Sequence, residues 1–393
     1  MSRRGVHDIA IVGAGMVGAS LALRLAQEGF DVAMIETREP AGWSANDDVD
    51  LRVVALAPSS VGFLDRTGAW KSIQSSRASP FRKMCVWDSI APGELTFDAA
   101  DRGESALGYI VENRLIQSVL WQNLQRTRIA LRVPAKVIAT ESNADRRTLT
   151  LDDGAALNAR IVIAADGADS TLRDLLHIDT ATRDYSQRAI VAHVKTERPH
   201  QSTAWQRFLP NATLAFLPLA DGRSSIVWSL PTADAERVLA LDDAAFCREL
   251  GAAFDVRLGT VNTATKRAAI PLRMRLADSY TAPRFALIGD AAHVVHPLAG
   301  QGVNLGLRDA AELADILIEA RDAKRDFAAE HVLRRYERRR RSDDALSAYA
   351  FDAIQRIFGT DFPPLAALRG AALNMTDRIA PLKRALARHA AGR

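Results

Sequence analysis

Residues 8–36 read DIAIVGAGMVGASLALRLAQEGFDVAMIE, and this stretch carries the clearest structural signal in the chain. The apolar, β-branched run at its start predicts a short strand, and Gly13, Gly15 and Gly18 follow in the pattern G-x-G-x-x-G. Leucine and alanine then recur at helical spacing up to the next glycine, and a second apolar run ends in Glu36. A strand, a glycine turn, a helix, a second strand and an acid, in that order, predict a dinucleotide-binding unit.

The glycines and the acid each have a mechanical reason to stand where they do. Gly13 lets the chain turn tightly, Gly15 lets the backbone approach a pyrophosphate, and Gly18 lets the helix pack closely on the strand. Glu36 follows Gly18 at close to the spacing of about 20 residues expected for an acid that accepts hydrogen bonds from a ribose. A glycine-rich turn in an unrelated α/β unit is the alternative, and the motif alone does not choose between NAD and FAD.

Two later segments bear on the choice of cofactor. Residues 160–173 read RIVIAADGADSTLR, a strand that ends in an Asp-Gly pair. Residues 285–304 read FALIGDAAHVVHPLAGQGVN, in which a strand ends at Asp290 and a glycine-bearing loop precedes a helix. Asp290, at the carboxyl end of its strand, is placed to accept hydrogen bonds from polyol hydroxyls. The loop can present backbone N–H groups to the edge of a flavin ring, so these segments favour FAD.

With these segments, the sequence resembles the FAD-dependent aromatic hydroxylases of the para-hydroxybenzoate hydroxylase type over nearly its whole length. Within them it is most similar to the ubiquinone-biosynthesis hydroxylases, in AFLPLADGRSSIVWS (215–229), HPLAGQGVNLGLRDAAELA (296–314) and YERRRRSDDAL (336–346). The segments VWD (86–88) and GYIVENRLIQSVLW (108–121) look more like the bacterial hydroxylases of the C5 and C6 positions than like the C1 enzyme. The ring position itself stays open.

The resemblance implies which residues bind the cofactor. The glycine triplet and Glu36 would bind the ADP half of FAD, residues 166–167 would serve both FAD and NAD(P)H, and Asp290 would hold the ribityl chain. Arg52, in DLRVVAL, and Arg114, in VENRLIQSVLW, match arginines of the family, and the second would contact the flavin. In full, the predicted cofactor-binding residues are Gly13, Gly15, Gly18, Glu36, Arg52, Arg114, Asp166, Gly167, Gly289, Asp290, Gly300, Gly302, Val303 and Asn304.

The resemblance also implies a reaction. NAD(P)H would reduce FAD, the reduced flavin would capture dioxygen as a C4a-hydroperoxide, and one oxygen atom would pass to the ring of a polyprenylated phenol on the way to ubiquinone. Because water would release hydrogen peroxide instead of product, such a site must stay dry. The loop with His296, Pro297, Gly300 and Gly302 is the predicted oxygen-transfer site, and no general base is identified. The alternatives are an FAD hydroxylase of a soluble aromatic compound, a prenyl reductase and a non-catalytic flavin-binding assembly subunit of the same fold.

The predicted fold is α/β, with a Rossmann-like FAD-binding domain, an inserted antiparallel-sheet substrate domain and C-terminal helices. The cofactor segments lie far apart in the chain, so the FAD-binding domain is discontinuous. Alternating runs such as AIVAHVKTE, TLAFLPL and SSIVWSL, with a turn signal at Asp221 and Gly222, predict the antiparallel sheet. The predicted division is 1–75, 103–180 and 280–345 for the FAD-binding domain, 76–102 and 181–279 for the substrate domain, and 346–393 for the helical region.

The amino-acid composition indicates the cellular compartment in which the protein is expected to work. Two cysteines, Cys85 and Cys247, cannot build a disulfide framework or a cysteine-only zinc site, so we expect a reducing compartment and two buried, chemically quiet thiols. No apolar run approaches the roughly 18 residues of a membrane span. Asp8 interrupts the run after Arg3 and Arg4 that superficially suggests an export signal. A cytoplasmic location follows.

The positive charge has two interpretations. The formal net charge is +4, and much of the excess lies in RRYERRRR at residues 334–341. One interpretation is a solvated helix surface; the sharper one is a contact with the anionic inner membrane or with a ubiquinone-biosynthesis protein complex. The basic, amphipathic residues 378–388 have the same two interpretations. Neither nucleic acid nor metal is predicted, because no recognition motif accompanies the charge and His293 and His296 lack a third ligand nearby.

Overall fold

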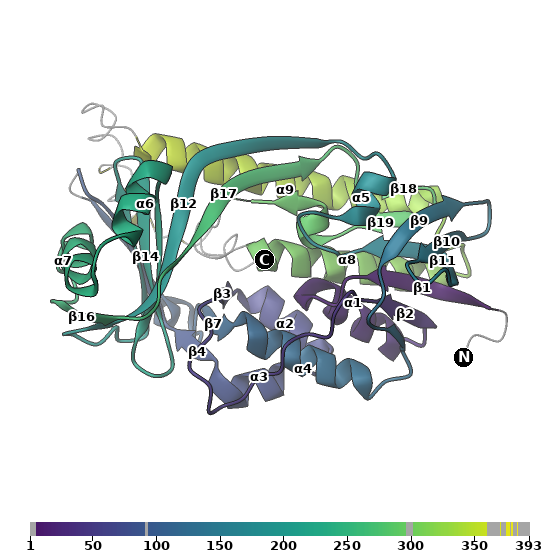
Figure 1. Ribbon diagram of the computed structural model, residues 1–393, viewed down its shortest axis with the longest axis horizontal. Coiled ribbons are helices and arrows are strands. Elements are labelled where there is room, and N and C mark those ends of the chain that lie inside the picture. Colours follow the sequence, from purple (N-terminus) through teal and green to yellow (C-terminus); the bar gives the residue numbers. More distant parts are fainter. Residues whose placement is uncertain are drawn as a thin grey trace.

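A computed structural model describes residues 5–90, 93–295 and 302–359, together with residues 370, 375–377, 379 and 383. Within these residues the chain forms three sheets with helices packed around them (Figure 1). The predicted α/β class, with a Rossmann-like unit and an antiparallel-sheet part, is confirmed.

The sheet that carries the glycine motif is built on β1 (Val6–Val12). Its neighbours β2 (Val32–Ile35) and β11 (Ala156–Ala164) both run parallel to β1, in the order β11-β1-β2. All four residues of β2 are buried, as expected where helices cover both faces of a parallel sheet. The other strands of this eight-stranded sheet are β8 (Ala130–Arg132), β9 (Val137–Ser142), β10 (Arg147–Leu151), β18 (Thr281–Ala282) and β19 (Phe285–Leu287).

Helices pack around this sheet and enclose the larger core. α1 (Met16–Gln27) starts directly after the glycine turn and packs against α4 (Asn113–Gln125) and α8 (Gly302–Asp322). Leu21 and Leu25 of α1 are fully buried, so the apolar spacing predicted the buried face correctly. The other helices of this part are α2 (Pro58–Arg66), α3 (Trp70–Arg77), α5 (Thr171–Leu175) and α9 (Glu330–Gly359).

The predicted antiparallel sheet is present and has nine strands in the described part of the chain. β14 (Ala212–Pro218) and β15 (Ser224–Pro231) form the hairpin predicted by the Asp-Gly signal, and β15 pairs antiparallel with β12 (Thr180–Thr196). The remaining strands are β5 (Lys83–Asp88), β6 (Glu94–Asp98), β13 (Thr203–Leu209), β16 (Val261–Ala264), β17 (Ala268–Ala277) and β20 (His293–Val294). One pairing differs from a purely antiparallel sheet, because β13 runs parallel to β5.

The outer face of this sheet packs on α6 (Thr232–Leu239) and α7 (Asp243–Ala253). Phe246 of α7 is fully buried beside Trp228 of the sheet, with ring centroids 6.4 Å apart. Cys85 and Cys247 are both buried and reduced, as expected. This second core leaves the inner face of the sheet turned toward the rest of the molecule.

A three-stranded sheet connects the two parts. β7 (Gly108–Glu112) pairs antiparallel with β3 (Val53–Leu56) and β4 (Ser79–Phe81). Ile110 of β7 lies in one buried cluster with Leu217 of β14, so the small sheet packs on the nine-stranded one. Two short 3-10 helices, η1 (Ala99–Arg102) and η2 (Gly289–Ala291), complete the described elements.

The long strands β12 and β17 run across the upper part of Figure 1, from the cofactor-motif part to α6 and α7, and α9 lies along them. The arginine-rich residues 334–341 belong to α9, where Arg335 pairs with Glu319 of α8 at 2.9 Å. Among the residues that the structure describes, no helix combines the length and the apolar character needed to cross a bilayer. Most of the amphipathic residues 378–388 lie outside the described residues.

Candidate active site

The glycine turn between β1 and α1 is tightly packed at two of its glycines and open at the third. A Cβ atom on Gly13, whose φ is +103°, would lie 2.3 Å from the carbonyl oxygen of Ala165. A Cβ atom on Gly18 would lie 2.1 Å from the carbonyl oxygen of Gly13. At Gly15, the N-cap of α1, a Cβ atom would meet nothing within 4 Å, and no side chain caps the helix there. The first turn of α1 therefore presents its N–H groups to open space, which suits a phosphate.

Glu36, the residue directly after β2, accepts a hydrogen bond from the backbone of this turn. One carboxylate oxygen, Oε2, accepts a hydrogen bond from the Ala14 backbone N–H at 2.7 Å, and Oε1 accepts from the Thr37 N–H at 2.7 Å. Oε1 also accepts from the Thr37 hydroxyl at 2.9 Å, whereas Oε2 of this half-buried side chain has the Ala14 N–H as its one donor among the described residues and can accept a further bond. Glu36 is thus fixed beside the turn with acceptor capacity left for a sugar hydroxyl.

A pocket of about 500 Å³ lies between the glycine turn and the inner face of the nine-stranded sheet. Seven of the predicted residues line it: Gly15, Arg52, Gly167, Gly289, Asp290, Gly302 and Val303. The sheet contributes a largely apolar wall of Ala189, Val191, Leu217, Ser225, Val227, Ile270 and Leu272. A larger hollow of about 730 Å³ lies between α7 and β16, but none of the predicted residues lines it. The pocket at the glycine turn is therefore the candidate site.

Arg52 and Asp290 are the only charged side chains among the described residues that line this pocket. Asp290 is exposed to the pocket, but the surrounding protein displaces much of the water that would otherwise solvate its carboxylate. This burial raises the pKa of Asp290, and the positive charges of His293 and Arg52 oppose the rise. A single carboxylate at the carboxyl end of β19 is thus available to accept hydrogen bonds from hydroxyl groups.

Other predicted residues lie beside the pocket and do not line it. Arg114, at the start of α4, donates from Nη2 to Asp47 Oδ2 at 2.6 Å. Asp166 accepts from the Leu172 N–H at 3.3 Å, while its buried Oδ1 has no hydrogen-bond partner among the described residues, and burial raises the pKa of this carboxyl. Gly13, Gly18 and Glu36 shape the turn behind the pocket, and His296, Pro297 and Gly300 lie outside the described residues.

Asn304, a predicted cofactor-binding residue, has its side-chain amide engaged within the protein. Its Nδ2 donates to the Ala55 carbonyl at 2.7 Å, and its Oδ1 accepts from the Ala57 N–H at 2.9 Å and from the Ser60 hydroxyl at 2.7 Å. The side chain is buried, and the amide is committed to β3 and the start of α2. Asn304 therefore attaches α8 to the segment that follows Arg52.

Several residues that position parts of the site were not predicted from the sequence. Glu112 accepts from Arg77 and from the Asp50 backbone N–H, at 2.8 and 2.6 Å, and so holds the segment that carries Arg52. A Cβ atom on Gly306 would lie 2.7 Å from Val17 Cγ2, which brings α8 close to α1. The spacing of Gly302 and Gly306, four residues apart on one helix, was the available signal.

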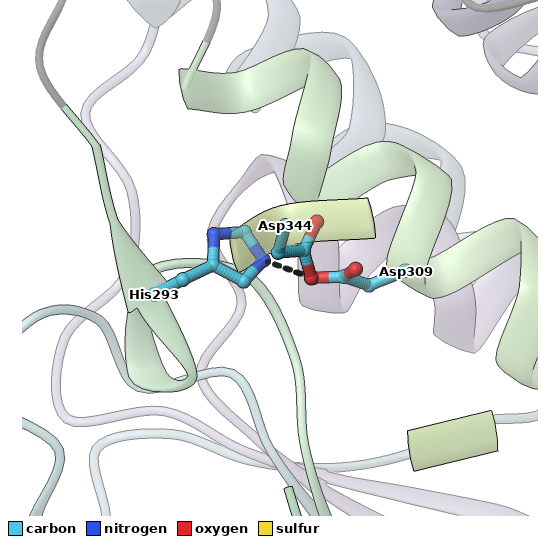
Figure 2. Close-up of side chains that lie close together, drawn as sticks. All are labelled: His293, Asp309 and Asp344. Carbon is cyan, nitrogen blue, oxygen red and sulfur yellow. Dashed lines mark hydrogen bonds and ion pairs between the residues drawn. The ribbon is translucent and has the colours of Figure 1, made fainter. Parts of the chain in front are cut away.

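A buried group of three side chains, drawn in Figure 2, contacts the Gly289–Asp290 turn through the Gly289 backbone N–H. Asp309 of α8, Asp344 of α9 and His293 of β20 offer ligand atoms within 4.8 Å of one another. Arg340, however, donates to Asp309 Oδ1 at 2.7 Å and to Asp344 Oδ1 at 2.5 Å. A guanidinium already compensates both acids, so these residues do not fit a metal ion.

The pocket fits a dinucleotide with a flavin. An uncapped helix start at Gly15 suits the pyrophosphate, Glu36 suits a ribose, and Asp290 suits a polyol chain. The apolar face of the nine-stranded sheet suits an aromatic ring system.

Comparisons with known proteins agree with this geometry. Residues 7–380 match the protein family described as "FAD binding domain". The 3-demethoxyubiquinol 3-hydroxylase of Escherichia coli (strain K12) is 39% identical over 386 residues, which cover 98% of each chain. Ubiquinone hydroxylase UbiL of Rhodospirillum rubrum is 37% identical over 388 residues, covering 98% of this chain and 90% of the relative. The crystal structure of p-nitrophenol 4-monooxygenase PnpA from Pseudomonas putida superposes with a TM-score of 0.77 at 21% identity, covering 97% of this chain and 96% of that one.

Proposed function

Because the chain belongs to the FAD binding domain family, together with the ubiquinone hydroxylases, we propose that it is an FAD-dependent monooxygenase that hydroxylates the ring of a polyprenylated phenol in ubiquinone biosynthesis. The observation that carries this proposal is the pocket of about 500 Å³, which joins the glycine turn to an apolar sheet face and contains one carboxylate, Asp290. Bound FAD supplies the redox chemistry with dioxygen, and the protein supplies position, electrostatics and dryness.

Different residues of the site are proposed to bind different parts of FAD. The N-terminus of α1 at Gly15 holds the pyrophosphate, Glu36 holds the ribose, and Asp290 accepts hydrogen bonds from the ribityl hydroxyls. The sheet wall excludes water, which protects an oxygen-transfer reaction from loss as hydrogen peroxide. Asp166 and Gly167, next to the same turn, are proposed to serve the electron donor, NADH or NADPH, as well as FAD.

The apolar wall also supports the substrate class. In the described lining, the nine-stranded sheet contributes eight side chains, the seven of the apolar wall and Val294 of β20, of which only Ser225 is polar. A phenol with a long prenyl tail buries mostly apolar surface, and burial of such surface in an apolar site is favourable by about 25 cal/mol per Å². A soluble aromatic compound would bring less apolar surface and more polar groups, for which this wall offers few partners.

We also propose that the protein touches an anionic membrane through one face of α9. Arg338, Arg341, Leu346 and Tyr349 fall on one side of this helix by its 3.6-residue repeat, and all four are exposed, Leu346 by 62% and Tyr349 by 58%. Basic side chains next to exposed apolar ones are typical of a surface that binds anionic lipid, where the polyprenylated substrate resides.

Vesicle binding tests this contact. Leu346→Asp should reduce sedimentation with vesicles that contain an anionic lipid, whereas Ile138→Asp, a change at an exposed apolar residue of β9, should leave it unchanged. Equal binding of both variants, or no binding by the unchanged protein, would argue against the contact while leaving the enzymatic proposal intact.

Assays of the purified protein test the enzymatic proposal. The protein should carry FAD in its visible spectrum, and a prenylated phenol should stimulate its oxidation of NADH or NADPH and appear as a hydroxylated product by mass spectrometry. A colourless protein that cannot be reconstituted with FAD would refute the proposal. Stimulation by soluble aromatic compounds only would keep the reaction class and exclude the prenylated substrate.

A further inference from the structure

The Gly289–Asp290 turn is held from behind by a buried network of charged side chains. The Gly289 backbone N–H donates to Asp309 Oδ2 at 2.9 Å, and His293 Nε2 donates to the same oxygen at 2.6 Å. Asp309 thus binds the first residue of the short η2 segment, which presents Asp290 to the pocket, and His293, two residues after that segment ends. Figure 2 shows the imidazole of His293 pointing at the two carboxylates that reach it from α8 and α9.

The network extends to α9 through Arg340. This guanidinium donates from Nε to Asp309 Oδ1 at 2.7 Å, from Nη2 to Asp344 Oδ1 at 2.5 Å and from Nη1 to Asp343 Oδ2 at 2.7 Å. His293, Asp309 and Asp344 have side chains at most 1% exposed, and that of Arg340 is 8% exposed. A planar donor with three bonds in fixed directions sets the position of Asp309 more tightly than a point charge would.

The charged groups of this network shift one another's pKa values and that of Asp290. Burial alone would lower the pKa of His293, but the carboxylates of Asp344 and Asp309 outweigh it and raise this pKa to about 9. Burial would raise the pKa of Asp309, but His293 and Arg340 outweigh it and lower this pKa. The imidazolium of His293 in turn opposes the rise in the pKa of Asp290. His293 therefore carries a positive charge near neutral pH, directly behind the carboxylate in the pocket.

We propose that His293, Asp309, Asp344 and Arg340 form a positioning cluster that fixes the Gly289–Asp290 turn and thereby sets the affinity of the site for FAD. The proposal rests on the proposed function, since it assumes that Asp290 binds the cofactor. None of the four side chains lines the pocket in the described structure, so they act through the turn and do not touch the cofactor. The cluster links α9, which contributes no predicted cofactor-binding residue, to the turn that carries Asp290.

Arg340→Lys tests the cluster most cleanly, because it keeps the charge and loses the forked geometry. The matched control is Arg335→Lys, the same change on the same helix, at a residue whose side chain is 34% exposed and also pairs with α8 through Glu319. We expect Arg340→Lys to raise the dissociation constant of FAD for the apoprotein roughly tenfold, measured by quenching of flavin fluorescence, and Arg335→Lys to change it less than about twofold. Equal constants for Arg340→Lys and the unchanged protein would overturn the proposal.

The pH profile of FAD binding provides a readout that a purely structural role would not move. The groups that face His293 are Asp309 from α8, Asp344 from α9, Asp290 from its own turn, and the Tyr280 ring at 6.1 Å, while Arg340 of α9 lies on the far side of the two carboxylates and bonds to both. FAD affinity should fall as the pH rises through about 9, where His293 loses its proton, and this fall should be absent in His293→Gln. His293→Gln also serves if Arg340→Lys does not fold. A profile shared by His293→Gln and the unchanged protein would contradict the cluster's role.

Failure of the cluster and failure of the proposed function give different results. If the unchanged protein does not bind FAD, the proposed function fails. If it binds FAD, and Asp290→Ala weakens binding while Arg340→Lys and His293→Gln do not, the site stands and the positioning cluster is refuted.

Discussion

Gly13 and Gly15 stand two residues apart and face different surroundings. At Gly13 the backbone has a left-handed φ of +103° and the carbonyl of Ala165 occupies the place of a side chain. At Gly15 the backbone has an ordinary φ of −65°, and the space beside it is open. The fold thus requires the first glycine, whereas no neighbouring atom requires the second, and we propose that the ligand in the pocket does.

This difference predicts opposite phenotypes for the same substitution. Gly15→Ala should leave the free energy of unfolding of the apoprotein within about 0.5 kcal/mol, because its Cβ meets nothing, and should weaken FAD binding at least roughly tenfold by blocking the pyrophosphate. Gly13→Ala should destabilise the apoprotein by about 2–4 kcal/mol through backbone strain and overlap. Urea unfolding and flavin titration check both, and a Gly15→Ala protein with normal FAD affinity would contradict the assignment of the phosphate site.

At the scale of elements, local signals were predictable and pairings between distant segments were not. The strand, turn and helix around Gly15 follow from adjacent residues, and the structure confirms them. The amide of Asn304 bonds to Ala55, 249 residues away, so its use in joining α8 to β3 has no local signature. The parallel pairing of β13 with β5 and the meeting of His293 with α8 and α9 are hidden for the same reason.

Asn304 supplies a stability prediction for these elements. Asn304→Ala removes hydrogen bonds to the half-buried backbone of Ala55 and Ala57 and to the buried Ser60 hydroxyl, so it should cost about 2–3 kcal/mol of unfolding free energy. Asn262→Ala, at an exposed residue of β16, should cost at most about 0.5 kcal/mol. Urea unfolding curves measure both values. A similarly small loss of unfolding free energy in the two variants would show that the contact between α8 and β3 contributes little to stability.

At the scale of the whole molecule, the pocket forms only where the two large sheets meet. Seven of the residues predicted from the sequence line this pocket, and all of them except Arg52 belong to or follow a strand end or a glycine motif. The apolar wall was predicted only as a substrate-side sheet, since the residues that face inward depend on how the sheet curves over the glycine turn. FAD as cofactor and the ubiquinone-hydroxylase resemblance are confirmed by the family match and the relatives.

Stability of the whole fold should depend on pH through His293. The folded protein holds this proton more tightly than the unfolded chain does, so the stability it contributes is fully present below about pH 6.5 and is lost as the pH rises through about 9. Between pH 7 and pH 9 the free energy of unfolding should fall by about 2 kcal/mol more in the unchanged protein than in His293→Gln. Burial raises the pKa of Asp344 to about 7, so this carboxyl is half protonated at pH 7 and nearly completes its titration by about pH 8, below the midpoint for His293. Parallel pH dependences in urea unfolding would refute the charged state of His293.

The most direct test of the account is the profile of quinone intermediates, by mass spectrometry, in a strain that lacks this gene. We expect one under-hydroxylated prenylphenol to accumulate, which would also identify the ring position, and we expect the intact gene to restore the profile where a gene with Asp290→Ala does so poorly. A normal quinone profile in the strain without the gene would contradict the central claim that this flavoprotein hydroxylates a ubiquinone precursor.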